Sequence, residues 1–185
     1  MKRAALVAFL ALAVASGCST GVKQVYHTAV GASSRYYEVK TVGGKTALDR
    51  FDAVGVESFN PSPMRGAIPS GLPAKVQAAV VKQLGDSKVF SAVKAGTPPA
   101  GGLLIRGKFM DFDPGGSALR AVGFGVDPFV TAQMELVDAG SGNVIGVAMV
   151  TGTVKSALRT GMDELADGMG KAVKGLVEQH HSKKE

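Results

Sequence analysis

The apolar positions between residues 51 and 177 recur with the periods of strands and helices, and they predict one mixed domain. The segment from Phe51 to Phe59 is rich in β-favouring residues and predicts a first strand. Ser70 and Pro73 then open a helix that is predicted to end at Gly85, because apolar residues recur at helical spacing in between. Further strands are predicted at Lys88–Val93, Leu103–Phe112, Phe129–Val137 and Val144–Val154.

A closing helix is predicted from about Gly161 to Val177, with Thr160 as its N-cap. The pattern as a whole predicts an α/β fold of the α+β kind: a single sheet of about four to five strands, with a helix after the first strand and a C-terminal helix packed on the sheet. Gly161, Gly168 and Gly175 recur along one flank of the closing helix and predict close approach to another backbone. That backbone belongs either to the protein's own sheet, the simpler explanation, or to a second chain in a ring.

The first residues have the order of a secretory signal. Lys2 and Arg3 precede an unbroken apolar run over residues 4–15, and the small residues Ser16 and Gly17 follow. A helix of this length rises roughly 18 Å, well short of the roughly 30 Å hydrocarbon core of a bilayer. We therefore expect residues 1–17 to be an export signal, cleaved between Gly17 and Cys18.

Cys18 follows the small residues directly, and Ala15-Ser16-Gly17-Cys18 resembles the bacterial lipobox, with alanine where leucine is usual. It is the only cysteine in the sequence, so no disulfide can form within the chain. We expect a lipid (palmitate) anchor on Cys18, because each buried methylene contributes about 0.8 kcal/mol and two or three acyl chains hold durably. The alternative is an ordinary signal that leaves Cys18 as a free thiol.

Ser19 stands where an aspartate is associated with inner-membrane retention, so the predicted location is the outer membrane, facing the periplasm.

The remaining 168 residues suit one domain. We expect a lipidated tether over residues 18–46, a single α/β periplasmic domain over 47–179 and a polar tail over 180–185. Fully stretched, some 25 residues of tether would lift the domain on the order of 80 Å from the membrane.

The charge balance argues against nucleic acid as a partner. The sequence has 21 basic and 15 acidic residues, and loss of Lys2 and Arg3 lowers the formal charge from +6 to +4. The basic residues are scattered, apart from Lys183 and Lys184, and no basic stripe is interleaved with aromatic residues.

Candidate catalytic groups are few. The histidines, His27, His180 and His181, lie outside the predicted domain, so we expect no histidine base, no metal site and no cofactor there. Asp111 and Asp113 would project from one face of a strand about 7 Å apart, a separation that a sugar hydrolase could use. A turn explains them better, because Asp113 precedes Pro-Gly and can bond the turn backbone. We predict a protein that is not an enzyme.

The segment around residue 124 offers candidate contacts for a partner. Arg120 could grip a carboxylate or a phosphate through two hydrogen bonds, although pairing within the domain is the simpler expectation. Phe124 lies between Gly123 and Gly125 and could be an exposed anchor or a core plug.

Four short motifs in this region carry a family resemblance: the Pro-Gly turn, Ala-Leu-Arg, Gly-Phe-Gly and the Leu-Val-Asp hairpin, within residues 107–125 and 135–144. They resemble an uncharacterised family of bacterial lipoproteins, domain of unknown function 4410, over about Phe51 to Val177. The predicted order of elements is also similar in topology to the periplasmic lipoprotein domain of the curli secretion component, to a polysaccharide-export lipoprotein and to activators of cell-wall synthases. The resemblance implies a role in envelope machinery.

Two functions therefore remain open. The first is a non-catalytic binding or assembly module of an envelope machine for secretion, polysaccharide export, motility or wall synthesis, tethered by lipid to the membrane and contacting an envelope protein, with homo-oligomerisation possible. The alternative is a glycan-binding protein or hydrolase that uses Asp111 and Asp113.

Overall fold

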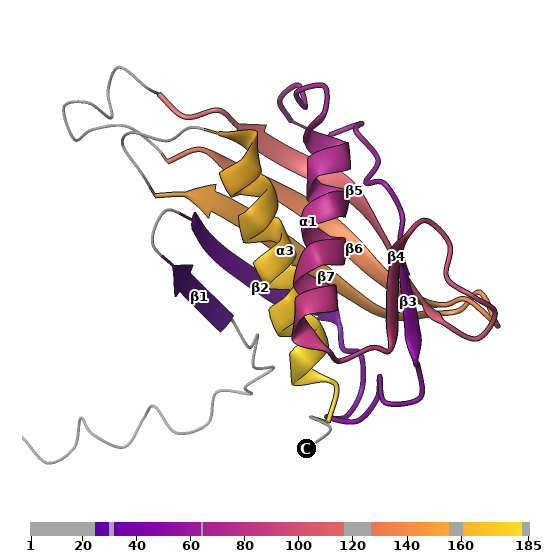
Figure 1. Cartoon of the computed structure of the whole chain (residues 1–185). Helices are drawn as coiled ribbons and strands as arrows, with labels where there is room; N and C mark the ends of the chain where they lie inside the picture. The colour runs from indigo at the N-terminus through magenta and orange to yellow at the C-terminus, as the bar shows by residue number, and fades with distance from the viewer. Residues whose placement is uncertain (1–24, 30–31, 64, 117–126, 156–160, 183–185) are drawn as a thin grey trace, which may run out of the picture.

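In the described part of the computed structural model, one mixed sheet carries two helices on a single face (Figure 1). The structure describes residues 25–29, 32–63, 65–116, 127–155 and 161–182. The strands lie in the order β1-β2-β7-β6-β5-β3-β4. Their bounds are β1 Val25–Ala29, β2 Ala32–Lys40, β3 Ala53–Val56, β4 Ala92–Ala95, β5 Leu103–Asp113, β6 Phe129–Asp138 and β7 Val144–Val154. The predicted α+β class is confirmed, but the described residues form a sheet of seven strands rather than four or five.

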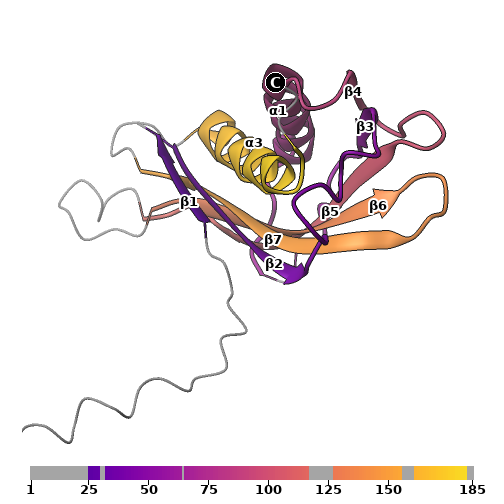
Figure 2. The same ribbon diagram turned by 90° about the horizontal axis from the view of Figure 1, so that it is seen from below.

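The two helices lie side by side on the same face of the sheet, as the view from below shows (Figure 2). They are α1, Leu72–Ser87, and α3, Met162–Gln179. The core fills the space between helices and sheet, with Phe109 and Met134 among its fully buried side chains. The opposite face, called the open face below, carries neither helix.

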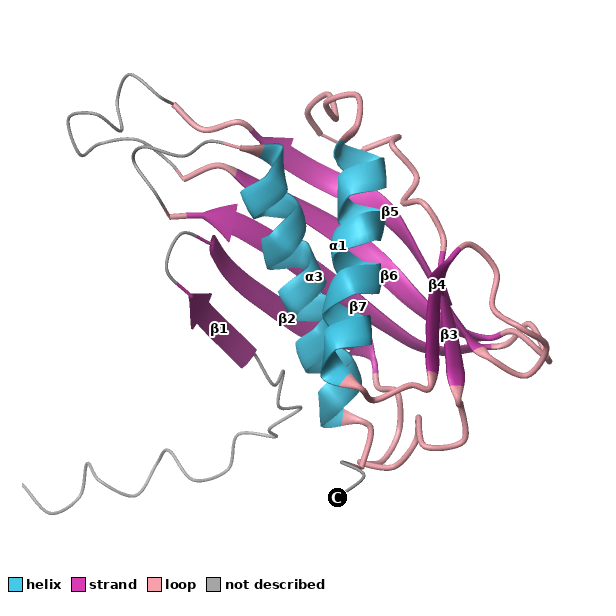
Figure 3. Cartoon of the chain, in the orientation of Figure 1, coloured by secondary structure: helices cyan, strands magenta, loops and turns pink. Residues whose placement is uncertain are grey.

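Chain direction divides the sheet into two parts (Figure 3). Along the sheet, the neighbouring strands β1, β2, β7, β6 and β5 are antiparallel to one another, whereas β3 pairs in parallel with both β5 and β4. A parallel pair needs a crossover connection, and α1 supplies it between β3 and β4.

The ends of the helices differ in part from the predicted ones. Gly71, with φ of +91°, precedes α1, and its side-chain-free backbone adopts the left-handed conformation there without strain. The helix continues past Gly85 to Ser87, so the predicted end at Gly85 is wrong. Gly161 is the N-cap of α3, and the predicted cap Thr160 lies outside the described residues.

The glycine spacing of α3 has a structural explanation within the chain. A Cβ on Gly168 would come within 3.0 Å of the Gly152 Cα of β7 and the Ser33 oxygen of β2. A Cβ on Gly152 would come within 2.4 Å of the Leu165 oxygen. The predicted close approach is therefore confirmed at Gly168, where the backbone approached is the protein's own sheet, whereas the nearest atoms to a Cβ on Gly161 belong to the side chain of Glu164.

The predicted tether is wrong over much of its length. Residues Val25–Ala29 and Ala32–Lys40 are strands, and β2 pairs with β7 in the interior of the sheet. Tyr36 of β2 is 2% exposed and belongs to the core. The strand was missed because its core-facing positions Ala32 and Ser34 are small, where the α3 backbone lies close to the sheet.

The predicted polar tail is likewise corrected at its start. His180 and His181 are buried, because carboxylates distant in sequence meet both imidazoles. Residues 183–185 lie outside the described part of the chain.

Candidate functional site

A hydrogen-bonded cluster joins the end of α3 to β2 and to the loop that follows it. His180 Nε2 lies 2.9 Å from Glu38 Oε1, and His180 Nδ1 lies 3.3 Å from the Gly44 oxygen. Gln179 Nε2 donates to the same Glu38 oxygen at 3.1 Å, while Glu38 Oε2 accepts the Val42 amide at 3.1 Å.

Both ring nitrogens of His180 face oxygen atoms, Nε2 a carboxylate oxygen of Glu38 and Nδ1 the backbone oxygen of Gly44. The pair is well shielded from water, with 5% of the His180 side chain and 13% of the Glu38 side chain exposed. Both carboxylate oxygens of Glu38 accept hydrogen bonds from the protein's own groups, and the cluster ties α3 to the β2–β3 loop.

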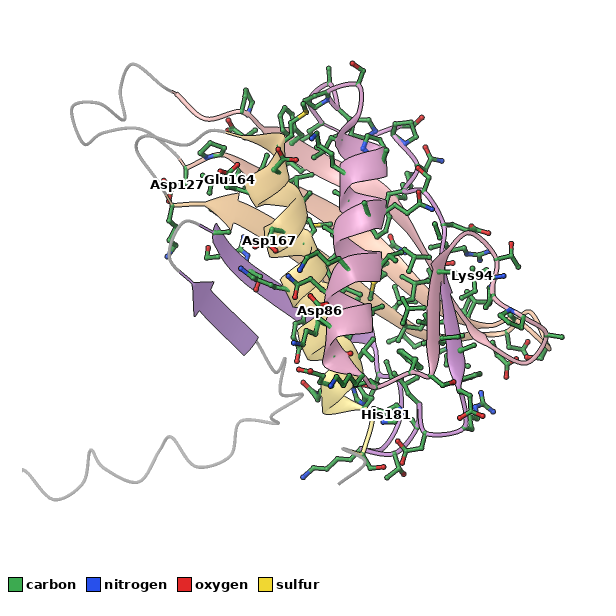
Figure 4. All side chains as sticks on the ribbon, viewed as in Figure 1. Asp86, Lys94, Asp127, Glu164, Asp167 and His181 are labelled. Carbon is green, nitrogen blue, oxygen red and sulfur yellow. The ribbon has the colours of Figure 1, made fainter. Side chains whose placement is uncertain are left out.

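A second contact lies one residue further along. His181 Nδ1 lies 3.2 Å from Asp49 Oδ1, and the His181 ring meets Phe90 edge-on with centroids 5.7 Å apart. The Ser182 amide donates to Asp49 Oδ1 at 2.7 Å. His181 lies near the end of the chain, opposite the end of the molecule where Asp127 and Glu164 lie (Figure 4).

Two hollows on the surface are lined by polar side chains. One, of about 580 Å³, lies over the cluster and is lined by Glu38, Thr41, Gly43, Gly44, Lys45, Gln179 and His180. The other, of about 510 Å³, is lined by Glu57, Ser58, Asn60, Arg106, Gly107, Lys108, Gln133 and Glu135. Arg106 and Glu135 form an ion pair of 2.7 Å in the second hollow.

The candidate carboxylates lie elsewhere. Asp111 pairs with Thr131 across the β5–β6 ladder, and Asp113 pairs with Phe129, both outside these two hollows. As the sequence predicts, Asp113 Oδ1 accepts a turn amide, that of Gly115, at 2.7 Å.

The predicted partner residues Arg120, Gly123, Phe124 and Gly125 lie outside the described residues, as do Gly17 and Cys18. Among the described residues, no group of three or more His, Cys, Asp or Glu side chains could hold a metal ion. No helix in the described part of the chain is long and apolar enough to cross a membrane.

Sequence reasoning missed the cluster of Glu38, Gln179 and His180. Its members are 141 and 142 residues apart in sequence and come together only because α3 returns to β2. The one weak signal in the sequence is Tyr36, two residues before Glu38, because it is one of three tyrosines that all lie in the segment predicted to be a tether.

Comparison with known proteins places the chain in a family. Residues 54–157, more than half of the chain, match the family model described as "Domain of unknown function (DUF4410)". The chain belongs to this family. The matched segment of the DUF4410 protein runs from β3 to the region after β7, so β1, β2 and α3 lie outside it.

Two solved PelC structures share the fold of this DUF4410 protein at low sequence identity. A PelC dodecamer from Paraburkholderia phytofirmans superposes with a TM-score of 0.54 at 17% identity, covering 83% of this chain and 99% of the PelC chain. A second PelC dodecamer gives 0.53 at 13% identity with the same coverage. A DUF330 protein from Xanthomonas campestris gives 0.41 at 11% identity, covering 77% of this chain and 90% of its own. No curated protein matches the chain.

Proposed function

We propose that the protein is an outer-membrane lipoprotein that faces the periplasm, anchored through Cys18, and that it acts as a non-catalytic assembly module of a cell-envelope machine. The observation that carries the proposal is the fold likeness to PelC over 99% of the PelC chain, together with the lipobox-like Ala15-Ser16-Gly17-Cys18. The PelC structures are dodecamers, so we also propose that this chain forms a homo-oligomer.

Several features favour assembly over catalysis. The Glu38 carboxylate and the His180 imidazole bond groups of their own chain, and Asp113 holds a turn. Such groups stabilise a rigid scaffold, on which binding depends.

The anchor is tested by Cys18→Ala in cells fed a labelled fatty acid. We expect the wild-type protein to take up label and the variant to take up none and to accumulate with its signal attached, because the thioether has no sulfur on which to form. Ser19→Ala is the matched control and should be labelled like the wild type. Labelled Cys18→Ala protein would contradict the anchor.

The assembly role is tested by a photo-crosslinking residue at position 124, where Phe124 is a candidate for an exposed aromatic anchor and a core plug is the alternative. We expect a crosslink to a second copy of the chain or to one specific envelope protein. Photo-crosslinking from position 94, on strand β4, is the control. If position 124 captures nothing, or the same mixture as position 94, the proposed assembly through position 124 is wrong.

A further inference from the structure

Two exposed hydrophobic side chains stand out on β2. Tyr37 is 40% exposed and Val39 is 62% exposed, and they are the large hydrophobic residues that the described surface leaves open. Tyr37 lies on the open face beside Met149 of β7, and Val39 lies at a bulge between Glu38 and Lys40.

The exposed charged residues of β2 around this pair are basic. Arg35 and Lys40 of β2 are exposed, and the open-face positions of β7 opposite them, from Val147 to Thr153, carry no charge. The nearby acid, Glu38, points to the helix side and bonds His180 and Gln179. Arg35, Tyr37, Val39 and Lys40 are called the β2 patch below.

The length of chain before β1 decides what can cover this patch. Val25, the first residue of β1, lies seven positions after Cys18, and such a segment spans at most about 25 Å. Val25 pairs with Tyr36 in the β1–β2 ladder, next to Tyr37. A lipid on Cys18 therefore brings this end of β1, and the patch beside it, close to the membrane surface.

We propose that the β2 patch lies against the anionic headgroups of the membrane that carries the anchor. The inference rests on the lipidation of Cys18 in the proposed function. Tyrosine is favoured at membrane interfaces because its ring is apolar and its hydroxyl is polar. Arginine and lysine there are attracted by anionic headgroups. The sheet then has a fixed orientation, with the β1–β2 edge toward the membrane and β4 at the far edge.

The orientation is tested on the lipidated protein in phosphatidylethanolamine–phosphatidylglycerol vesicles. Cys18 is the only cysteine, so Val39→Cys introduces a single free thiol for a fluorophore once Cys18 carries lipid. Lys94→Cys in β4, drawn at the opposite edge from β1, is the control (Figure 4). Nitroxide-headgroup lipids should quench the label at position 39 and leave the label at position 94 bright. Equal quenching at both positions, or protection of position 39 without lipid by a second copy of the chain, overturns the proposal.

Mass spectrometry of the same preparation separates the two proposals. If Cys18 carries no lipid, the anchor fails, and sedimentation of that protein with the vesicles then tests the patch by itself. Arg35→Gln with Lys40→Gln should weaken binding roughly 10- to 30-fold, the effect of two interfacial charges. Lys94→Gln with Lys174→Gln removes the same charge elsewhere and should leave binding unchanged. Equal binding of the two double variants to the vesicles overturns the proposal that the β2 patch contacts the membrane.

Discussion

The Tyr36 hydroxyl joins β2 to α3 at the edge of the core. It lies 2.6 Å from Gln179 Oε1 and 3.2 Å from the Gly175 oxygen. Burial, reinforced by the charges of Glu38 and Glu178, raises the pKa of Tyr36 to about 12. The folded protein therefore favours the neutral phenol more strongly than the unfolded chain does.

Tyr36→Phe should lower the free energy of unfolding by about 1 kcal/mol at neutral pH, because a buried hydrogen bond is lost. The pH dependence has a definite sign. A raised pKa stabilises the folded state below the ordinary value near 10, and this contribution is lost as the pH rises toward about 12. Between about pH 9 and about pH 11, urea denaturation should show a larger loss of the free energy of unfolding for the wild type than for Tyr36→Phe.

Tyr37→Phe is the matched control, since Tyr37 is 40% exposed. It should unfold like the wild type at both pH values. A Tyr36→Phe variant with the same pH dependence as the wild type would show that the hydroxyl is not held in the core.

At the scale of elements, α3 is placed by glycines. Gly168 meets the sheet, and a Cβ on Gly170 would come within 2.9 Å of the Ala79 oxygen of α1. The helix thus contacts β7 on one side and α1 on another at backbone distance. Glycine lowers helix propensity by roughly 1 kcal/mol relative to alanine, and close packing offsets that cost.

Gly152→Ala should destabilise the protein by about 1–3 kcal/mol, because the new methyl would overlap the Leu165 oxygen and neither backbone can move freely. Gly85→Ala is the comparison, since nothing lies within 4 Å of its Cβ position. That change should stabilise the protein by up to about 1 kcal/mol. Thermal and urea unfolding of both variants measure the difference, and equal effects would contradict the packing described here.

At the scale of the whole molecule, the sequence pattern predicts where the strands lie better than it predicts which strands pair. The large apolar residues of β5, β6 and β7 follow strand spacing clearly, so these strands were predicted within a residue or two of their observed ends. The pairing of β3 with β5 and β4 was not predictable, because it depends on where α1 returns the chain.

In the candidate site as well, the sequence predicts contacts between residues close in sequence and misses those between distant residues. Asp113 bonds a turn amide two residues away, and a local pattern is enough to predict that contact. The Glu38–His180 pair joins residues 142 positions apart, and no local pattern carries it.

A chain that begins at Ala47 should fail to fold cooperatively, although the sequence pattern places the domain start there. Such a chain loses β2, leaves the backbone of β7 unpaired along one side and removes Tyr36 from the core. Circular dichroism during urea unfolding would show a broad transition or aggregation. A sharp transition with the wild-type free energy of unfolding would mean that β1 and β2 are dispensable.

The hydrogen bonds that hold the residues after α3 have a practical consequence for handling the protein. The Leu48 amide donates to the His180 oxygen at 3.0 Å, and the Ser182 amide donates to Asp49, so the described chain is held to the domain as far as Ser182. An affinity tag or fluorescent fusion joined directly after Ser182 starts at the folded surface and needs a flexible spacer of its own. Fusions that replace residues 180–182 remove the contacts between the last helix and the loop beneath it.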